Sequence, residues 1–310
     1  MRRPLVLLFP ALLLALVGCG GDDGGDSAEA TTSALAPATT VTASTAAQEP
    51  ATTVPTTDAP GTTVAATTEA PTTTAPPDPL TILVTNDDGI DAPGIDALVA
   101  ALSALPDVEI VVVAPATNQS GTSDTTSAAP VTWAADDTVS GVAGIAVAGT
   151  PADSVLVAVD ELGIVPDVIV SGVNSGQNIG IFVPLSRTVG AARTAARRGI
   201  PAIAISAGPL DGPDFATAAR LAAEEVAALR ATLGPEANDE HVVVNLNVPT
   251  CPTSSPVRGV VDVPVAAVFP EGTDGLNMTF DCTSTATDPA DDATAMLVGF
   301  ASRSIVPADL

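Results

Sequence analysis

Two adjacent aspartates, Asp87 and Asp88, follow the apolar run of residues 80–85 and precede a stretch with helical periodicity. Neighbouring carboxylates repel each other, so the pair is unfavourable unless water or a cation compensates its charge. Oxygen donors without histidine are the ligands that hard cations such as Mg²⁺, Mn²⁺ and Ca²⁺ prefer. The pair therefore points to a divalent cation, although for Asp-Asp-Gly taken alone a solvated turn or a helix N-cap is the more ordinary explanation.

Hydroxyl and amide side chains occupy the ends of two other predicted strands. Ser120 lies in the polar segment after residues 108–115, and Asn174 ends the run of residues 167–174. Ligands of open parallel sheets collect at the carboxyl ends of the strands, where such segments meet. We therefore expect Ser120 and Asn174 to join the aspartate pair around one cation, Mg²⁺ or Mn²⁺.

A third group of residues, Ser186, Arg187 and Thr188, stands at the start of a predicted helix over residues 188–199. The free N–H groups and the dipole of a helix N-terminus favour an anion, and an arginine can bind phosphate oxygens in a bidentate manner. Simple capping by Ser186 and Thr188 is the alternative interpretation. A divalent cation next to an anion-binding helix N-terminus provides the smallest set of groups that can support the transfer of a phosphoryl group to water.

Other chemistries have weaker support in the sequence. The single histidine, His241, opens a predicted strand after an acidic loop, and we expect it to be exposed and uninvolved, which argues against a Ser-His-Asp hydrolase. No cysteine pair has the spacing of a structural zinc site. We predict that Arg193, Arg197 and Arg198 form a solvated helix face and that Trp133 packs under a loop.

The candidate residues lie in a region of alternating strand and helix patterns, residues 79–310. Runs rich in Val and Ile indicate buried strands, and the segments between them have the periodicity of helices. The alternation predicts an α/β domain with a mostly parallel sheet covered by helices on both faces. Strands are predicted at residues 80–85, 108–115, 167–174, 201–206 and 241–249, and helices at residues 92–105, 151–162, 188–199 and 214–234.

Two parts of this domain have a less regular pattern. The segments VTWAADD and GIAVAG have the composition of shorter strands and are consistent with a hairpin. The tail from residue 250 is irregular, although its last part, AMLVGFASRSIVP, has the composition of strands. We therefore expect an irregular C-terminal extension after the main sheet.

The domain is strongly acidic and contains no lysine. Residues 79–310 hold eight arginines and 28 acidic residues, a formal charge of −20. Because nucleic-acid backbones are bound by cationic surfaces, this charge argues against a nucleic-acid polymer as a partner. A small phosphorylated ligand is compatible with the domain, since a divalent cation inverts the charge locally.

The N-terminal part of the chain is of a different kind. Residues 1–18 combine two arginines with an apolar segment too short for an ordinary spanning helix, which predicts a secretory signal peptide. The run Leu16–Cys19 resembles the lipobox of bacterial lipoproteins, in which the cysteine becomes the lipidated N-terminus; an uncleaved membrane anchor is the alternative. We expect an extracytoplasmic protein that acyl chains on Cys19 hold at the cell membrane.

Residues 19–78 are dominated by Thr, Ala and Pro, with no aromatic residue and no periodic apolar face. Such a segment cannot bury enough apolar surface to offset the entropy of ordering, so we predict a disordered tether. Beyond it only two cysteines remain, Cys251 and Cys282. In an exported protein they could pair, but their spacing alone does not establish a disulfide.

Five ordered segments of the domain resemble the SurE family, the survival-protein E nucleotidases. They read ILVTNDDGIDAPGI, VVVAPATNQSGTS, GTPADSV, PDVIVSGVNSGQNIG and TVGAA, while NLNVP and ATAMLVGFASRSIVP resemble later segments of the family. The resemblance covers essentially all of residues 80–310. It implies a Rossmann-like three-layer sandwich and a metal-dependent phosphomonoesterase that acts on nucleoside 5′- and 3′-monophosphates.

The resemblance also implies roles for individual residues and a state of assembly. Family members commonly form homodimers by exchanging C-terminal segments, which suits the irregular tail. By resemblance, the cation ligands are Asp87, Asp88, Ser120 and Asn174, the phosphate is surrounded by Asn86 and the segment of Ser186, Arg187 and Thr188, and the catalytic residues are Asp87, Asp88 and Asn86.

This chain departs from the family pattern in two places. Arg187 stands where a glycine is usual between the serine and the threonine, and the segment IFVPL lacks the family's tyrosine. Family members are also usually cytoplasmic, whereas this chain carries a predicted export signal. The alternative hypothesis is therefore a lipoprotein that binds nucleotide or phosphate with little or no catalysis.

Overall fold

The structure is a computed structural model that describes residues 79–209, 211–233 and 238–309. The predicted signal peptide (residues 1–18), the predicted lipidation site Cys19 and the predicted tether (residues 19–78) lie outside these residues. The described part of the chain belongs to one compact unit. None of the helices in this part is long and apolar enough to cross a membrane.

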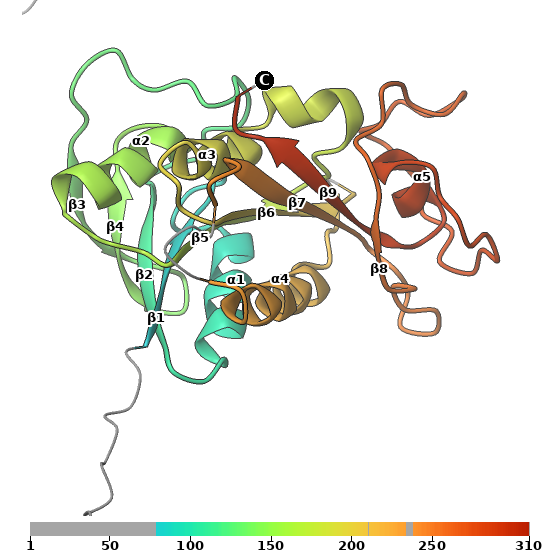
Figure 1. Ribbon diagram of the computed structural model, residues 1–310, viewed down its shortest axis with the longest axis horizontal. Helices are drawn as coiled ribbons and strands as arrows, with labels where there is room; N and C mark the ends of the chain where they lie inside the picture. The colour runs from blue at the N-terminus through green and yellow to red at the C-terminus, as the bar shows by residue number, and fades with distance from the viewer. Residues whose placement is uncertain (1–78, 210, 234–237, 310) are drawn as a thin grey trace, which may run out of the picture. The chain divides into compact units, whose positions relative to one another are not determined.

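The described residues form a nine-stranded sheet (Figure 1) in the strand order β3-β4-β2-β1-β5-β6-β7-β9-β8. From β4 to β7 in this order the neighbours are parallel, whereas β3 and β9 run antiparallel to β4 and β7. The prediction of an α/β fold with a mostly parallel sheet is confirmed. The strands are β1 (Leu80–Thr85), β2 (Val108–Pro115), β3 (Trp133–Asp137), β4 (Ala143–Val147), β5 (Val168–Ser175), β6 (Ala202–Gly208), β7 (Val242–Pro249), β8 (Val260–Asp262) and β9 (Ala301–Pro307).

Helices cover both faces of the sheet because successive side chains of a strand point to opposite sides. In β1, Ile82 and Val84 pack into the core that contains helices α1 and α4, and Leu83 packs into the core that contains α2 and α3. Figure 1 shows these two layers below and above the sheet. The helical segments are α1 (Pro93–Ser103), α2 (Pro151–Leu156), the π-helical η1 (Val157–Glu161), the 3₁₀ segment η2 (Gly180–Leu185), α3 (Arg187–Ala196), α4 (Phe215–Arg230) and α5 (Asp292–Leu297).

Strand β5 is irregular near its carboxyl end, and α1 packs tightly against it there. The pairing with β6 shifts register between Ser171 and Asn174, and such irregularities re-aim side chains near functional sites. Gly94, in the first turn of α1, approaches so closely that a Cβ atom would lie 2.0 Å from the carbonyl oxygen of Val173. The glycine therefore allows α1 to cover the end of β5 next to Asn174.

The predicted helix over residues 151–162 is confirmed; it is α-helical to Leu156 and continues as the π-helical η1 to Glu161. Two other predictions about local structure are wrong. In AMLVGFASRSIVP the first residues belong to α5, because Asp291 and Thr294 form a capping box that starts a helix there, and only β9 is a strand. Trp133 begins the edge strand β3 and is 39% exposed, so it does not pack under a loop. The predicted hairpin is confirmed by the antiparallel pair β3 and β4.

The arginines of α3 and its C-terminal end are less solvated than predicted. Arg193 is 6% exposed, donates from Nε to the carbonyl oxygen of Ala308 at 2.8 Å, and lies 3.8 Å from Asp124. Arg197 and Arg198 are partly exposed and form ion pairs. The prediction of a solvated face is wrong for Arg193 because the residues after β9 pack against α3.

The C-terminal extension is tied to the rest of the domain. Cys251, after β7, forms a disulfide with Cys282, and β9 pairs with β7. The two cysteines that the sequence left unassigned are therefore joined. The exchange of C-terminal segments between two subunits stays a prediction. His241 is exposed, as expected, and its Nδ1 lies 2.8 Å from the carbonyl oxygen of Ala196.

Candidate active site

The turn after β1 is closed by Asn86. Its Nδ2 donates to the carbonyl oxygen of Gly89 at 2.7 Å, and the Gly89 N–H donates to Asn86 Oδ1 at 3.2 Å. Gly89 has a φ of +106°, which favours glycine, and a Cβ there would lie 3.2 Å from the backbone of Thr117. Asn86 is fully buried, so its side chain shapes the turn that carries the two aspartates.

Asp87 is a buried carboxylate in this turn. The residue is 4% exposed, and its Oδ1 accepts a hydrogen bond of 2.6 Å from the hydroxyl of Thr188. Burial and then the charge of Asp88 raise the pKa of Asp87 from 3.8 to about 6, while the hydrogen bond from Thr188 opposes the rise. Within the described residues, no arginine forms an ion pair with Asp87. The charge of Arg187 also lowers the pKa of Asp87 but does not cancel the effect of burial, so a bound cation or a proton is favoured at this carboxylate.

Asp88 is held on the other side of the turn. Its Oδ1 accepts a hydrogen bond from Asn118 Nδ2 at 3.0 Å, and its Oδ2 accepts one from the Ser175 N–H at 3.1 Å. Burial raises the pKa of Asp88 above 3.8, and these two hydrogen bonds oppose the rise. An ionised carboxylate has about four lone-pair sites, so Asp88 retains acceptor capacity for a cation.

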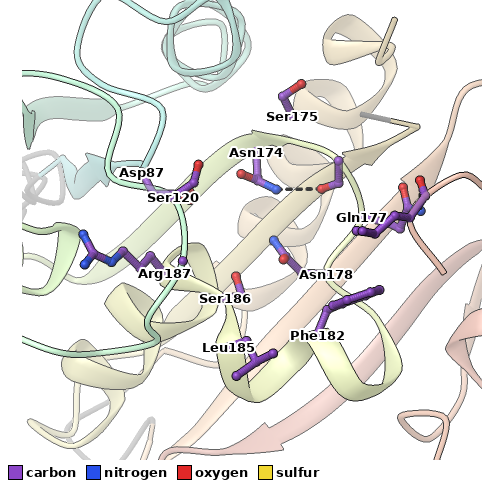
Figure 2. A pocket seen from close by; sticks show the side chains of 13 residues that line it. Asp87, Ser120, Asn174, Ser175, Gln177, Asn178, Phe182, Leu185, Ser186 and Arg187 are labelled. Atoms are coloured by element: carbon purple, nitrogen blue, oxygen red, sulfur yellow. Dashed lines mark hydrogen bonds between the residues drawn. The ribbon is translucent and has the colours of Figure 1, made fainter. Parts of the chain in front are cut away.

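Ser120 and Asn174 reach the same place from two other strand ends. The Gln119 N–H donates to the carbonyl oxygen of Asp87 at 2.7 Å, which fixes the segment after β2 against the aspartate turn and leaves Ser120 exposed beside it. Asn174 donates from Nδ2 to the carbonyl oxygen of Gly176 at 2.6 Å. Figure 2 shows that this hydrogen bond turns the amide oxygen of Asn174 toward Asp87 and Ser120.

Asp87, Ser120 and Asn174 line a cavity of about 260 Å³, which we call the smaller cavity. Asn86 and Thr188 are fully buried, and Asp88 lines a second cavity of about 500 Å³, the larger cavity, which shares only Ser175 with the first. The structure therefore brings together five of the eight predicted site residues and places Asp88 on the flank. The five that line the smaller cavity are Asp87, Ser120, Asn174, Ser186 and Arg187.

The start of α3 forms one wall of the smaller cavity. The Ser186 hydroxyl caps the helix by accepting a hydrogen bond of 3.1 Å from the Val189 N–H. Arg187 donates from Nε to the hydroxyl of Thr122 and from Nη1 to Gln119 Oε1, each at 3.0 Å. In Figure 2 its guanidinium accordingly points away from the middle of the cavity. The first N–H groups of α3 remain at the helix start, where the dipole favours an anion.

A buried amide network behind the smaller cavity was not predicted. Asn178 donates from Nδ2 to the hydroxyls of Thr188 at 3.3 Å and Ser206 at 2.9 Å. Asn247 bonds to both the N–H and the carbonyl of Asn178, at 2.7 and 3.1 Å, and Asn245 donates to the same carbonyl at 2.9 Å. Two asparagines spaced two residues apart in an apolar strand were the available signal, since such positions share one face.

The C-terminal extension also reaches the smaller cavity. Gln177 donates from Nε2 to the carbonyl oxygens of Gly275 at 2.6 Å and Leu276 at 3.2 Å, and Leu276 lines the cavity. Asp292 of α5 is fully buried and accepts a hydrogen bond of 3.1 Å from the Gly180 N–H at the start of η2. No local signal predicts these contacts, because they join residues about 100 positions apart in the chain.

The donor set fits a hard divalent cation. It consists of two carboxylates, a hydroxyl and an amide oxygen, and such oxygen donors suit Mg²⁺, Mn²⁺ or Ca²⁺. Across the described residues, no group of three or more His, Cys, Asp or Glu side chains is placed to hold a metal. The negative charge for a cation at this place therefore comes from Asp87 and Asp88.

Comparison with known proteins agrees with this architecture. Residues 82–266 match the family model named Survival protein SurE. A protein named 5′-nucleotidase SurE from Symbiobacterium thermophilum is 33% identical over 242 residues, which cover 74% of this chain and 93% of that relative. The crystal structure of Sure protein from Aquifex aeolicus has a TM-score of 0.60 and 26% identity, and the match covers 74% of this chain and 94% of that chain.

A second relative matches more strongly over a shorter stretch. The chain is 52% identical over 126 residues to a protein named 5′-nucleotidase SurE from Halobacterium salinarum, a match that covers 40% of this chain and 46% of the relative. The chain thus aligns with about half the length of this relative and with nearly all of the Symbiobacterium protein. The fold and these matches define a mostly parallel α/β protein with its site at the strand ends. The chain belongs to the SurE family.

In the metal-free protein, Asp87→Asn is expected to increase the free energy of unfolding at pH 7 by up to about 3 kcal/mol. The pKa of Asp87 is raised from 3.8 to about 6 in the folded protein, so folding favours the protonated carboxyl group. This contribution to stability is complete below pH 3.8 and is lost as the pH rises through about 6, where the buried carboxylate becomes charged. Urea unfolding in EDTA measures the difference, which should nearly vanish at pH 4. Asp239→Asn, at an exposed site, is the control. A difference that does not vary with pH would contradict this assignment.

Proposed function

We propose that this protein is a metal-dependent phosphomonoesterase that hydrolyses nucleoside 5′- and 3′-monophosphates to nucleoside and phosphate. The observation that carries the proposal is the buried Asp87 carboxylate, which lacks an ion-pair partner in the described part of the chain and lines a cavity beside the start of α3. The relatives named 5′-nucleotidase SurE support it. In this reaction the P–O ester bond breaks, a water oxygen bonds to phosphorus, and the nucleoside oxygen takes up a proton.

The divalent cation, Mg²⁺ or Mn²⁺, is proposed to be held by Asp87, Asp88, Ser120 and Asn174. When bound, it supplies Lewis-acid polarisation of the phosphoryl group. The chain itself orients these donors: Thr188 holds Asp87, and the Gly176 carbonyl fixes the amide of Asn174.

The phosphate is proposed to bind at the start of α3. There the Ser186 hydroxyl and the first N–H groups of the helix face an anion, and negative charge is favoured by the helix dipole. All three nitrogen atoms of the Arg187 guanidinium donate to Thr122 or Gln119. Because the group has five N–H donors, two of them are left for a phosphate oxygen at the edge of the cavity. Asn86 and the hydroxyl of Thr188 are engaged within the protein, so we propose that they position Asp87 and Asp88.

Purified full-length protein is expected to hydrolyse AMP and p-nitrophenyl phosphate only when Mg²⁺ or Mn²⁺ is added. The double substitution Asp87→Asn with Asp88→Asn removes the charge that attracts the cation, and kcat/KM should fall by at least about 100-fold, or about 3 kcal/mol. Release of phosphate across a series of metal concentrations measures this. Retained activity in the double variant would show that Asp87 and Asp88 are not the metal ligands. Tight nucleotide binding with no hydrolysis in the presence of any divalent cation would favour the alternative of a binding lipoprotein.

Thr188→Val is expected to raise the Mg²⁺ concentration needed for half-maximal activity by about tenfold at pH 6, because a hydrogen bond to a charged group is worth about 1.5–3 kcal/mol. Without the hydroxyl the pKa of Asp87 rises, and protons compete more strongly with the cation. The effect should shrink at pH 8, and Thr188→Ser should restore the wild-type value. If the required Mg²⁺ concentration rises equally at both pH values, or if Thr188→Ser does not restore it, the substitution has caused a general packing defect and the assigned role of the hydroxyl is wrong.

We also propose that the enzyme acts outside the cytoplasm while attached to the membrane through lipid on Cys19. The sequence of residues 1–19 supports this, and the disulfide of Cys251 with Cys282 suits an oxidising compartment. Cys19→Ala should move the protein from the membrane fraction to the soluble fraction, because acyl chains provide the attachment. Fractionation followed by immunoblotting measures this, and an unchanged membrane fraction would point to an uncleaved anchor.

A further inference from the structure

The larger cavity is lined by Asp88 of the aspartate turn and by no described residue of the start of α3. It is bordered by Asp88, by the segment after β2, by the start of α1, and by Pro213 and Phe215 at the start of α4. Its volume of about 500 Å³ is within the range of small-molecule sites. Because Ser175 lines both cavities, a ligand that reaches across this residue would occupy both.

The two cavities differ in charge. Among the described residues that line the larger cavity, two are acidic, Asp88 and Asp91, and none is basic. The smaller cavity also contains one acidic residue, Asp87, but Arg187 and the positive end of the α3 dipole lie in its wall. The phosphate of a substrate is therefore favoured in the smaller cavity, and the larger cavity suits a neutral group.

The larger cavity also has the chemistry to recognise such a group. Phe215 is half-buried, and its ring lies close to the first turn of α1, since a Cβ on Gly94 would lie 3.1 Å from its Cε1. A flat aromatic base can stack on such a ring. Asp91 is exposed, and in the described part of the chain its carboxylate has no hydrogen-bond partner, so both of its oxygens can accept hydroxyl groups of a sugar.

We propose that the larger cavity is the subsite for the nucleoside that leaves during hydrolysis, with its base against Phe215 and its ribose hydroxyls donating to Asp91. This inference rests on the proposed function, because it places the leaving group relative to the phosphate. The competing place for the nucleoside is the apolar part of the smaller cavity, which is lined by Phe182, Leu185 and Leu276. That part belongs to the same cavity as the anion site, so a nucleoside there would bind away from Asp91.

Steady-state kinetics of the full-length protein with two substrates test the proposal. Glycerol 2-phosphate carries the phosphate without a base, and AMP carries both. Phe215→Leu is expected to raise KM for AMP by about tenfold, which corresponds to the stacking of one base on an aromatic ring, and to leave kcat/KM for glycerol 2-phosphate unchanged. In Phe182→Ala the ratio of the two kcat/KM values should stay at the wild-type value. The reverse pattern would overturn the proposal and assign the nucleoside to the part of the smaller cavity that Phe182 lines.

Asp91→Asn keeps the shape of an exposed side chain, so it tests the ribose contact without risk to folding. The wild-type protein should prefer AMP over 2′,3′-dideoxyadenosine monophosphate, and the variant should lose this preference. Asp239→Asn removes the same charge at another exposed site and should retain it. An unchanged preference in Asp91→Asn would refute the ribose contact.

Calorimetric binding of adenosine separates this inference from the proposed function. Binding that is weakened about tenfold in Phe215→Leu supports the subsite even if the protein hydrolyses no phosphomonoester. Conversely, hydrolysis of AMP that neither Phe215→Leu nor Asp91→Asn affects would leave the proposed function intact and overturn the subsite.

Discussion

The carboxylate of Asp87 is buried at the end of β1, next to the charge of Asp88 and without an ion-pair partner among the described residues. A protein interior disfavours such a charge, and this burial raises the pKa of Asp87. The surrounding residues fix the position of this carboxylate through a chain of hydrogen bonds, in a place where a cation could bind it. Thr188 donates to it, Asn178 holds Thr188, and two asparagines of β7 hold Asn178.

The position of the site follows from the alternation of side chains along β1. Residues of this strand pack in turn against the α1 and α4 layer and the α2 and α3 layer. The two aspartates of the following turn are likewise divided between two cavities: Asp87 lines the one at the start of α3, and Asp88 the one near α1 and α4. A single turn can therefore face a phosphate on one side and the remainder of a substrate on the other.

The C-terminal extension belongs to the site as much as to the fold. Its disulfide fixes it to the end of β7, Asp292 holds the start of η2, and Leu276 lines the smaller cavity. Asp292 thereby supports η2, whose residues Phe182 and Leu185 line the same cavity as Leu276. These contacts explain how a segment with little regular structure contributes to the part of the molecule where chemistry is proposed.

Much of the fold followed from the sequence, because hydrophobic periodicity and helix caps are local properties. The parallel sheet, the order of its helices and the placement of polar loops at the strand ends were predictable, and Asp87, Ser120, Asn174, Ser186 and Arg187 do line one cavity. The failures were local patterns that tertiary packing overrides: Arg193 is buried by the residues after β9, and AMLV continues a capped helix.

By itself, then, the sequence determined which elements form and which polar side chains stand at their ends. Only the tertiary structure decided which cavity each of those side chains lines and which partners it contacts. It placed Asp88 and Asp87 on different cavities, turned the hydroxyl of Thr188 to Asp87, and brought Leu276 next to Gln177. The reason is physical: burial and hydrogen bonding depend on neighbours that lie far away in the chain, and no local pattern of residues records their distance.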